Sequence, residues 1–105
     1  MGAERRKYPR INTEQIISVA PISDSERLAY GKNISPGGIA FEVVGCEFEM
    51  GEVLRVTFNV EDATWVAVGR VTWATEMDAF TQEVGIEFVE IDPFALRSIQ
   101  ESAIE

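Results

Sequence analysis

The amino-acid sequence predicts an all-β protein, a six-stranded antiparallel β-barrel of the Greek-key type with a short C-terminal helix. Three observations lead to this fold class. Most of the 105-residue chain alternates between apolar and polar residues with a period of two, which is typical of half-buried strands. Segments rich in Gly, Pro, Ser and Asp interrupt this alternation at short intervals. The period becomes helical near residue 92. Because closure leaves no unpaired strand edges, a closed or nearly closed barrel is expected.

Six stretches carry the alternating pattern of a strand. In VLRVTFNV, residues 53–60, four apolar side chains fall on one face and polar residues lie between them. The same alternation occurs at 39–43 and 84–88. The expected strands are 12–20, 27–34, 39–43, 53–60, 65–75 and 84–88, and the turns between them include PISDSE, SPGG, residues 45–52 and MDAF.

A helix is expected at residues 92–104. Asp92 is a favourable N-cap, and Pro93 suits the first helical position. Leu96, Ile99 and Ala103 recur at helical spacing. The apolar face of this helix should pack on the barrel or close one of its ends.

The length of the chain corresponds to one domain with a modest core. We divide it into a flexible basic arm at 1–10, the barrel at 11–91 and the helix at 92–104. No repeat or low-complexity segment is present.

The net charge of -9 is unevenly distributed along the chain. Residues 1–10 hold four basic residues and one acidic residue, a net charge of +3, and the other 95 hold five basic and 17 acidic residues, a net charge of -12. A surface this negative repels the phosphates of nucleic acids and anionic lipid headgroups. No nucleic-acid polymer is therefore expected as a partner, whereas a small anion held by a local basic patch is compatible with this charge.

Cysteine and histidine usage restricts the chemistry further. Cys46 is the single cysteine and there is no histidine, which argues against an internal disulfide, a zinc site and a Cys-His nucleophile. No apolar run approaches the roughly 18 residues of a membrane span, and no signal-peptide core follows the charged N-terminus. We expect a cytoplasmic protein without membrane insertion, metal or cofactor.

The N-terminal segment RRKYPR concentrates positive charge. Pro9 disfavours a helical conformation at Tyr8, so the arm should be extended or turned. An extended chain places Arg6 and Arg10 on one side, about 13 Å apart at ~3.3 Å per residue. Each guanidinium can donate paired hydrogen bonds to a phosphate or to the O6 and N7 atoms of a guanine. A short basic N-terminus can also be a solvated tail without a ligand.

The segment NISPGG lies between two expected strands. Asn33 and Ser35 can cap backbone amides, and Pro36, Gly37 and Gly38 should make a turn in conformations that a residue with a Cβ avoids. Such a turn can bring backbone N–H groups close to a phosphate. The same residues also suit an ordinary hairpin turn.

Together the two segments resemble the signature of the PilZ family, RxxxR followed about 20 to 30 residues later by (D/N)xSxxG. Arg6 to Arg10 fill the first part, with Arg5 as an additional arginine, and Asn33 to Gly38 fill the second. Asn33 stands where Asp is commoner in the family. GRVTW, VGIEF and the C-terminal helix resemble later family elements, so the likeness covers nearly the whole chain.

The PilZ resemblance implies a receptor for cyclic di-GMP, a bacterial second messenger with two guanines and two phosphates. By similarity, Arg6 and Arg10 contact guanine edges and phosphates, and Arg5 assists. The opposing wall is assigned to Asn33, Ser35, Gly37 and Gly38. Trp73 matches a position where some members place an aromatic ring against a guanine, and it also suits an ordinary barrel aromatic. The family further implies a downstream protein in motility, pili or exopolysaccharide control. Whether one or two ligand molecules bind is open.

The sequence bears on three alternative functions. An enzyme is disfavoured because no histidine is present to act as a general base and the carboxylates follow a solvated strand face. A PilZ-like adaptor that binds only protein, independently of nucleotide, is the main alternative. Binding of single-stranded RNA on Phe58, Trp65 and Trp73 conflicts with the negative charge outside the arm.

Overall fold

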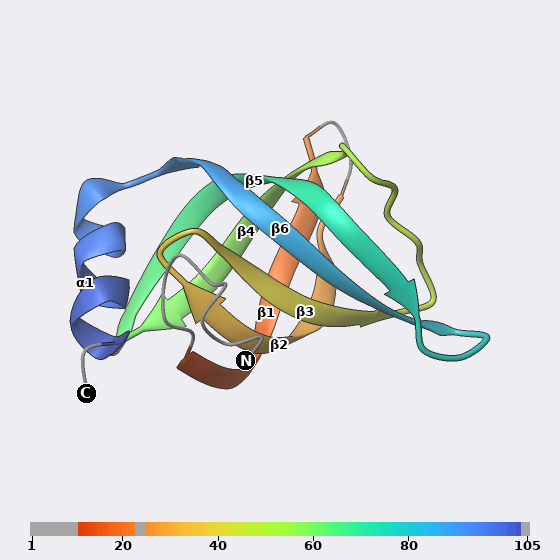
Figure 1. The fold of residues 1–105 in the computed structure, drawn as a ribbon, viewed down its shortest axis with the longest axis horizontal. Helices are drawn as coiled ribbons and strands as arrows, with labels where there is room; N and C mark the ends of the chain where they lie inside the picture. The colour runs from red at the N-terminus through yellow and green to blue at the C-terminus, as the bar shows by residue number, and fades with distance from the viewer. Residues whose placement is uncertain (1–10, 23–24, 104–105) are drawn as a thin grey trace, which may run out of the picture.

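The computed structural model describes residues 11–22 and 25–103, which form a closed barrel of six strands with one helix (Figure 1). The predicted fold class is confirmed. The elements are β1 (Ile11–Pro21), β2 (Arg27–Ser35), β3 (Gly38–Val44), β4 (Val53–Val60), β5 (Ala63–Glu76), β6 (Thr81–Ile91) and α1 (Pro93–Ala103).

The strand order around the barrel is β1-β2-β3-β6-β5-β4, and β4 closes the barrel by pairing with β1. All of these pairings are antiparallel. Hairpins join β1 to β2, β2 to β3, β4 to β5 and β5 to β6, while β3 lies beside β6 and β4 beside β1. This arrangement is a Greek key. It places the outer faces of β3, β6 and β5 next to one another, where the candidate site lies.

Apolar side chains fill the barrel interior as the alternation predicts. On β4, Leu54 and Val56 are fully buried, whereas Arg55 between them is exposed. On β3, Phe41 is fully buried at the centre of the core. Since burying one large apolar side chain contributes ~1.5–3 kcal/mol, these inward faces account for much of the stability of the fold.

Two elements outside the strands close the ends of the barrel. Phe48, in the loop between β3 and β4, is buried and packs edge-on against Phe41, with ring centroids 6.4 Å apart. The side chain of Gln82 fixes this loop, because it accepts a hydrogen bond from Phe48 N at 2.9 Å and donates one to Phe48 O at 3.1 Å. The helix α1 lies across the other end (Figure 1), where Ile99 joins the core.

The N-terminus of α1 is capped as predicted. Asp92 Oδ1 accepts a hydrogen bond from Phe94 N at 2.7 Å. The fully buried residues of the helix are Ala95 and Ile99, and Leu96 is only half-buried. Ile99 is therefore buried as the expected stripe requires, whereas Leu96 lies at the edge of the buried face, next to Ala95. In the part of the chain that the structure describes, no helix is long and apolar enough to cross a membrane.

The turn between β4 and β5 has an unusual backbone. Glu61 and Asp62 both have positive φ, 53° and 66°. Positive φ at both central residues is the geometry of a type I′ hairpin turn, which is normally occupied by Asn and Gly. Because neither residue is present, this turn had no clear sequence signal, and β5 begins at Ala63, before the expected residue 65.

The seam between β1 and β4 is short. It pairs four residues of each strand, from Ser18 opposite Thr57 to Pro21 opposite Leu54. Beyond this seam a side chain replaces the backbone pairing. The carboxamide of Gln15 donates a hydrogen bond to Asn59 O at 2.9 Å and accepts one from Asn59 N at 2.8 Å.

Candidate ligand-binding site

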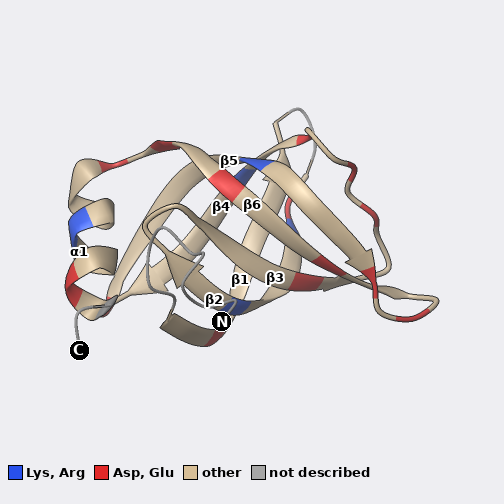
Figure 2. Ribbon diagram, viewed as in Figure 1, with Lys and Arg blue, Asp and Glu red and all other residues tan. Residues whose placement is uncertain are grey.

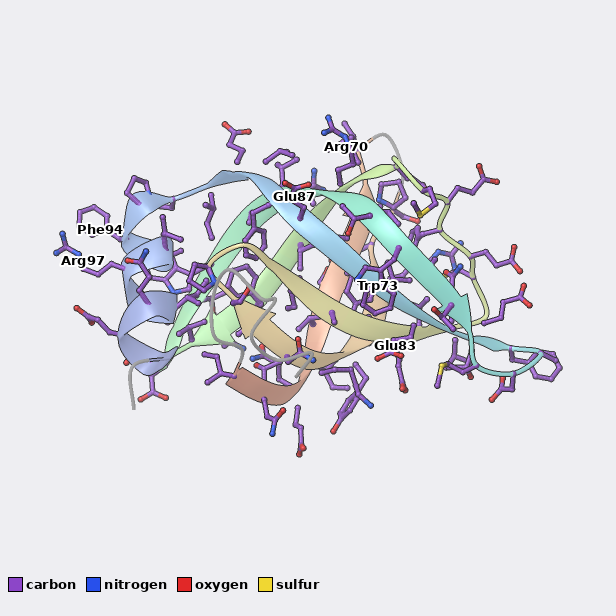
Figure 3. All side chains as sticks on the ribbon, in the orientation of Figure 1. Arg70, Trp73, Glu83, Glu87, Phe94 and Arg97 are labelled. Carbon is purple, nitrogen blue, oxygen red and sulfur yellow. The ribbon has the colours of Figure 1, made fainter. Side chains whose placement is uncertain are left out.

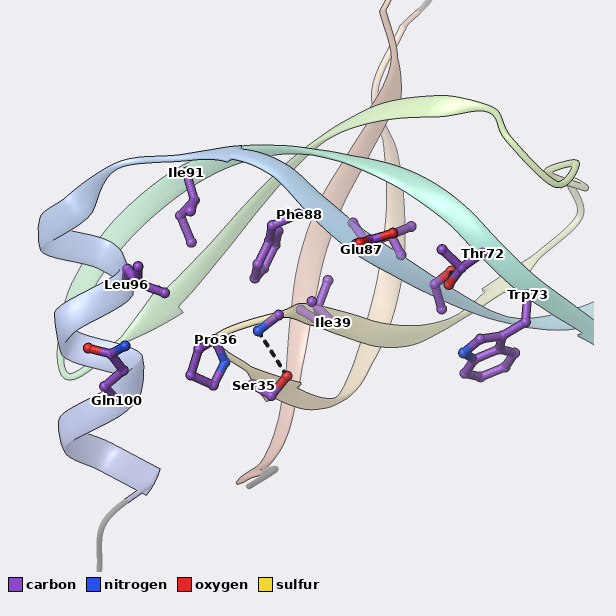
Figure 4. Close-up of a pocket in the computed structure, with 14 residues that line it drawn as sticks. Ser35, Pro36, Ile39, Thr72, Trp73, Glu87, Phe88, Ile91, Leu96 and Gln100 are labelled. Carbon is purple, nitrogen blue, oxygen red and sulfur yellow. Dashed lines mark hydrogen bonds between the residues drawn. The ribbon is translucent and has the colours of Figure 1, made fainter. Parts of the chain in front are cut away.

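A cavity of about 490 Å³ lies between the outer surface of the barrel and α1 (Figure 4). This volume falls in the usual range for small-molecule sites, roughly 300–1,000 Å³. The lining comes from the β2–β3 turn, β3, β5, β6 and α1. The lining residues are Ser35, Pro36, Gly37, Gly38, Ile39, Thr72, Trp73, Gly85, Ile86, Glu87, Phe88, Ile91, Leu96 and Gln100.

Two glycines allow close packing along this cavity. Gly38 of β3 lies opposite Glu87 of β6, and a Cβ at Gly38 would collide with the carbonyl oxygen of Ile86. Gly85 of β6 lies opposite Trp73 of β5, and a Cβ there would collide with the indole ring. Because these two positions have no side chain, β3 and the indole ring of Trp73 can both approach β6 closely.

The turn between β2 and β3 is held by two hydrogen bonds. Ser35 Oγ accepts one from Gly37 N at 3.2 Å, drawn in Figure 4, and Gly37 O accepts one from Phe88 N at 2.8 Å. This turn was expected to use glycine conformations that a residue with a Cβ avoids, but neither Gly37 nor Gly38 has a positive φ. Among the described glycines, positive φ occurs at Gly45 and Gly51. At Gly38 the requirement for glycine is steric and comes from the neighbouring strand.

Trp73 is half-buried on the outside of the barrel and forms the wall of the cavity farthest from α1 (Figure 4). It is therefore a surface aromatic, not a core residue. A ring in this position offers a face on which a base can stack.

Glu87 is the one ionisable side chain among the described residues that line the cavity. It is exposed, and Arg70 lies directly opposite on β5, beside Glu87 in Figure 3. The wall near α1 is mainly apolar, with Phe88, Ile91 and Leu96. Phe88 stacks on the core residue Phe58, with ring centroids 5.9 Å apart. The described lining thus combines stacking surface and backbone amides, without a cation.

The structure brings together four of the site residues predicted from the sequence: Ser35, Gly37, Gly38 and Trp73 line the same cavity. Asn33 is outside this lining. It lies on β2, two residues before Ser35, opposite Ala40 on β3. The predictions for Arg5, Arg6 and Arg10 concern residues outside the described part of the chain.

The walls of the cavity formed by β6 and α1 were not predicted from the sequence. Gly85 carried a usable signal, since a glycine inside an apolar strand often marks a close approach. Leu96 and Gln100 are four residues apart and therefore share a helix face, but the sequence does not say that this face meets a turn more than 50 residues earlier.

The aromatic residues considered as RNA platforms do not form one surface. Phe58 is only 1% exposed and belongs to the core. Trp65 is half-buried, and its Nε1 atom is buried without a hydrogen-bond partner. Trp73 alone of the three lines the cavity.

The described residues thus form a closed six-stranded β-barrel with an external cavity beside a C-terminal helix. The chain belongs to the PilZ domain family, whose family model matches residues 4–104. No curated protein sequence matches it.

Solved structures show the same fold at low sequence identity. The Bacillus subtilis inhibitor of motility, MotI/DgrA, superimposes with a TM-score of 0.82 at 23% identity over 95% of this chain and 50% of that protein. The PilZ domain of YcgR from Escherichia coli, solved with c-di-GMP, has a TM-score of 0.75 at 14% identity, covering 95% of this chain and 89% of that one. The K. pneumonia MrkH–c-di-GMP complex has a TM-score of 0.72 at 14% identity, covering 95% and 51%. The chain thus spans half the length of the Bacillus protein.

Proposed function

We propose that this domain is a receptor for cyclic di-GMP, which binds in the cavity beside α1 and whose signal is passed to a partner protein. The observation that carries the proposal is the convergence of Ser35, Gly37, Gly38 and Trp73 on one cavity in a PilZ family member. Two structural neighbours, YcgR and MrkH, were solved with c-di-GMP, which supports this ligand class.

The cavity suits part of such a ligand. The Trp73 ring offers a stacking face for a guanine, and the turn offers the Ser35 hydroxyl as a donor to a phosphate. The described lining holds no cation to balance two phosphates. We assign that role to the guanidinium groups of Arg6 and Arg10, with Arg5 assisting. Asn33, on the same strand as Ser35, completes the proposed set.

The binding free energies that these contacts can supply indicate that the arginines and Trp73 must act together. Binding with a micromolar dissociation constant requires about -8 kcal/mol. Two bidentate arginine contacts contribute roughly 1–3 kcal/mol each, and stacking adds on the order of 1–3 kcal/mol per base. Neither the arginines nor Trp73 alone reaches this value, so removing either should weaken binding measurably.

Isothermal titration with cyclic di-GMP tests the proposal. Arg6→Ala and Arg10→Ala should each weaken binding about tenfold to a hundredfold, since ~1.4 kcal/mol corresponds to a factor of ten. Arg55→Ala is the matched control, because Arg55 is exposed on β4, away from the cavity. The same titration gives the number of ligand molecules bound. Unchanged affinity in both arm variants would remove the arm from the site, and no binding by the unmodified protein would favour the nucleotide-independent adaptor.

The proposal includes the bacterial cytoplasm as the compartment, because the messenger acts inside the cell. Cys46 is free, which suits a reducing environment.

A further inference from the structure

Three exposed apolar side chains come from the end of β3 and from the turn between β5 and β6, two segments at the end of the barrel away from α1 (Figure 1). Val44, Met77 and Phe80 are 71%, 52% and 74% exposed. Their backbones are neighbours of Thr81, which follows Phe80, pairs with Val44 on β3 and has a carbonyl oxygen that accepts a hydrogen bond from Met77 N at 2.9 Å. We call these three residues the tip patch.

The backbone under the tip patch is held by several hydrogen bonds. Asp78 Oδ1 accepts hydrogen bonds from Phe80 N and Thr81 N, both at 2.9 Å. Phe80 O accepts one from Gly45 N at 2.9 Å, which joins the β5–β6 turn to the end of β3. The exposed side chains therefore project from an ordered frame, so little ordering cost remains to be met on binding. Exposed apolar clusters on such frames mark interaction sites.

Beside the tip patch lies an acidic groove, a cavity of about 290 Å³. Its lining includes Glu47, Glu76, Asp78 and Phe80. Figure 2 shows acidic residues along the β3–β4 loop and the β5–β6 hairpin at this end. Burial raises the pKa of the Cys46 thiol in this groove, and the positive charge of Arg27 opposes that rise. The groove thus places carboxylates directly beside an exposed aromatic ring.

We propose that the tip patch and the acidic groove form a docking surface for a protein segment that presents an arginine or lysine next to an apolar side chain. The cation fits the carboxylates of Glu47 and Glu76, and the apolar neighbour covers Phe80 and Met77. Neither a nucleic acid nor an anionic membrane suits this surface, because both are negatively charged. The surface is separate from the cavity beside α1, so it holds whether or not cyclic di-GMP is the ligand there.

Amide chemical shifts with a model peptide test this surface. The probe is the blocked peptide Ac-RLRLRL-NH2, compared with Ac-ELELEL-NH2. The arginine peptide should shift amides in 44–48 and 76–82, and the glutamate peptide should not. Phe80→Ser should raise the dissociation constant at least fivefold. Its matched control is Phe94→Ser, because Phe94 is similarly exposed, at 68%, and projects from the outer side of α1 (Figure 3).

The charge contribution has its own control. Glu47→Gln/Glu76→Gln should weaken arginine-peptide binding, whereas Glu90→Gln/Glu101→Gln, with the same change in net charge at other exposed positions, should leave it unchanged. Asp78 is kept because it caps the turn. Shifts spread over all acidic surfaces, equal effects of the matched pairs, or no binding would each overturn the proposal. Concentration-dependent shifts in 76–82 without peptide would also overturn it, since they would show that a second copy of the chain covers the tip patch.

Discussion

The indole ring of Trp73 lies directly over Gly85, in the space that a Cβ at residue 85 would need. The two residues face each other across the β5–β6 pairing. The position of the ring in the cavity wall therefore depends on the missing side chain of its partner.

Gly85→Ala should displace the Trp73 ring. Overpacking of this kind typically costs about 1–3 kcal/mol of unfolding free energy. Cyclic di-GMP affinity should fall as well, because the stacking face moves. Urea denaturation and titration calorimetry measure the two effects. Adding Trp73→Ala should recover most of the lost stability without restoring affinity, and simple additivity of the two substitutions would contradict the predicted contact.

Glu87→Gln should weaken cyclic di-GMP binding about fivefold to tenfold, equivalent to roughly 1–1.4 kcal/mol. A carboxylate can accept hydrogen bonds from both N1–H and the amino group of a guanine, whereas a carboxamide has only one accepting oxygen. The control is Glu83→Gln on the same strand, which changes the net charge equally but does not line the cavity. Tighter binding by Glu87→Gln would mean that the carboxylate only repels phosphate.

The barrel was predictable because its core residues follow the alternation of apolar and polar residues that is typical of half-buried strands. Residues such as Leu54 and Val56 alternate with polar neighbours, and the structure buries them as that alternation requires. The burial of Phe48 was not predictable, since this residue lies in an irregular loop without periodicity and its position depends on Gln82, 34 residues away. Four of the 14 residues that line the candidate site, Ser35, Gly37, Gly38 and Trp73, were recognisable from the sequence. The remainder depends on how α1 and β6 meet, which is a tertiary relationship.

Asp62→Gly should stabilise the protein by about 0.5–1 kcal/mol. A left-handed conformation costs a residue with a Cβ roughly 1–2 kcal/mol, whereas the entropy penalty of glycine is about 0.5–1 kcal/mol. Asp62 has φ of 66°, so the exchange is favourable. Asp62→Ala retains the strain and should give no gain. Equal urea midpoints for the glycine and alanine variants would contradict this account of the turn.

The turn beneath Phe80 should respond to acid. Hydrogen bonds from Phe80 N and from Thr81 lower the pKa of Asp78 below its ordinary value. The contribution of these bonds to stability is therefore fully present above the unfolded-state pKa of about 3.9 and is lost as the pH falls through the lower folded-state pKa. Amide shifts of Phe80 and Thr81 should titrate with a midpoint below about 3.9. Asp78→Asn should abolish this titration, and a midpoint at or above the ordinary value would refute the assignment.

The short seam between β1 and β4 determines how this cylinder comes apart. A barrel opens most easily between the two strands that share the fewest hydrogen bonds. Between β1 and β4, the side chain of Gln15 makes two hydrogen bonds where backbone pairing is absent. Once that junction parts, the cylinder unrolls into a sheet with two free borders, each able to accept a strand from another molecule. The carboxamide of Gln15 thus opposes strand exchange between copies of the protein. Loss of its hydrogen bonds would expose the edge strands and favour aggregation through them.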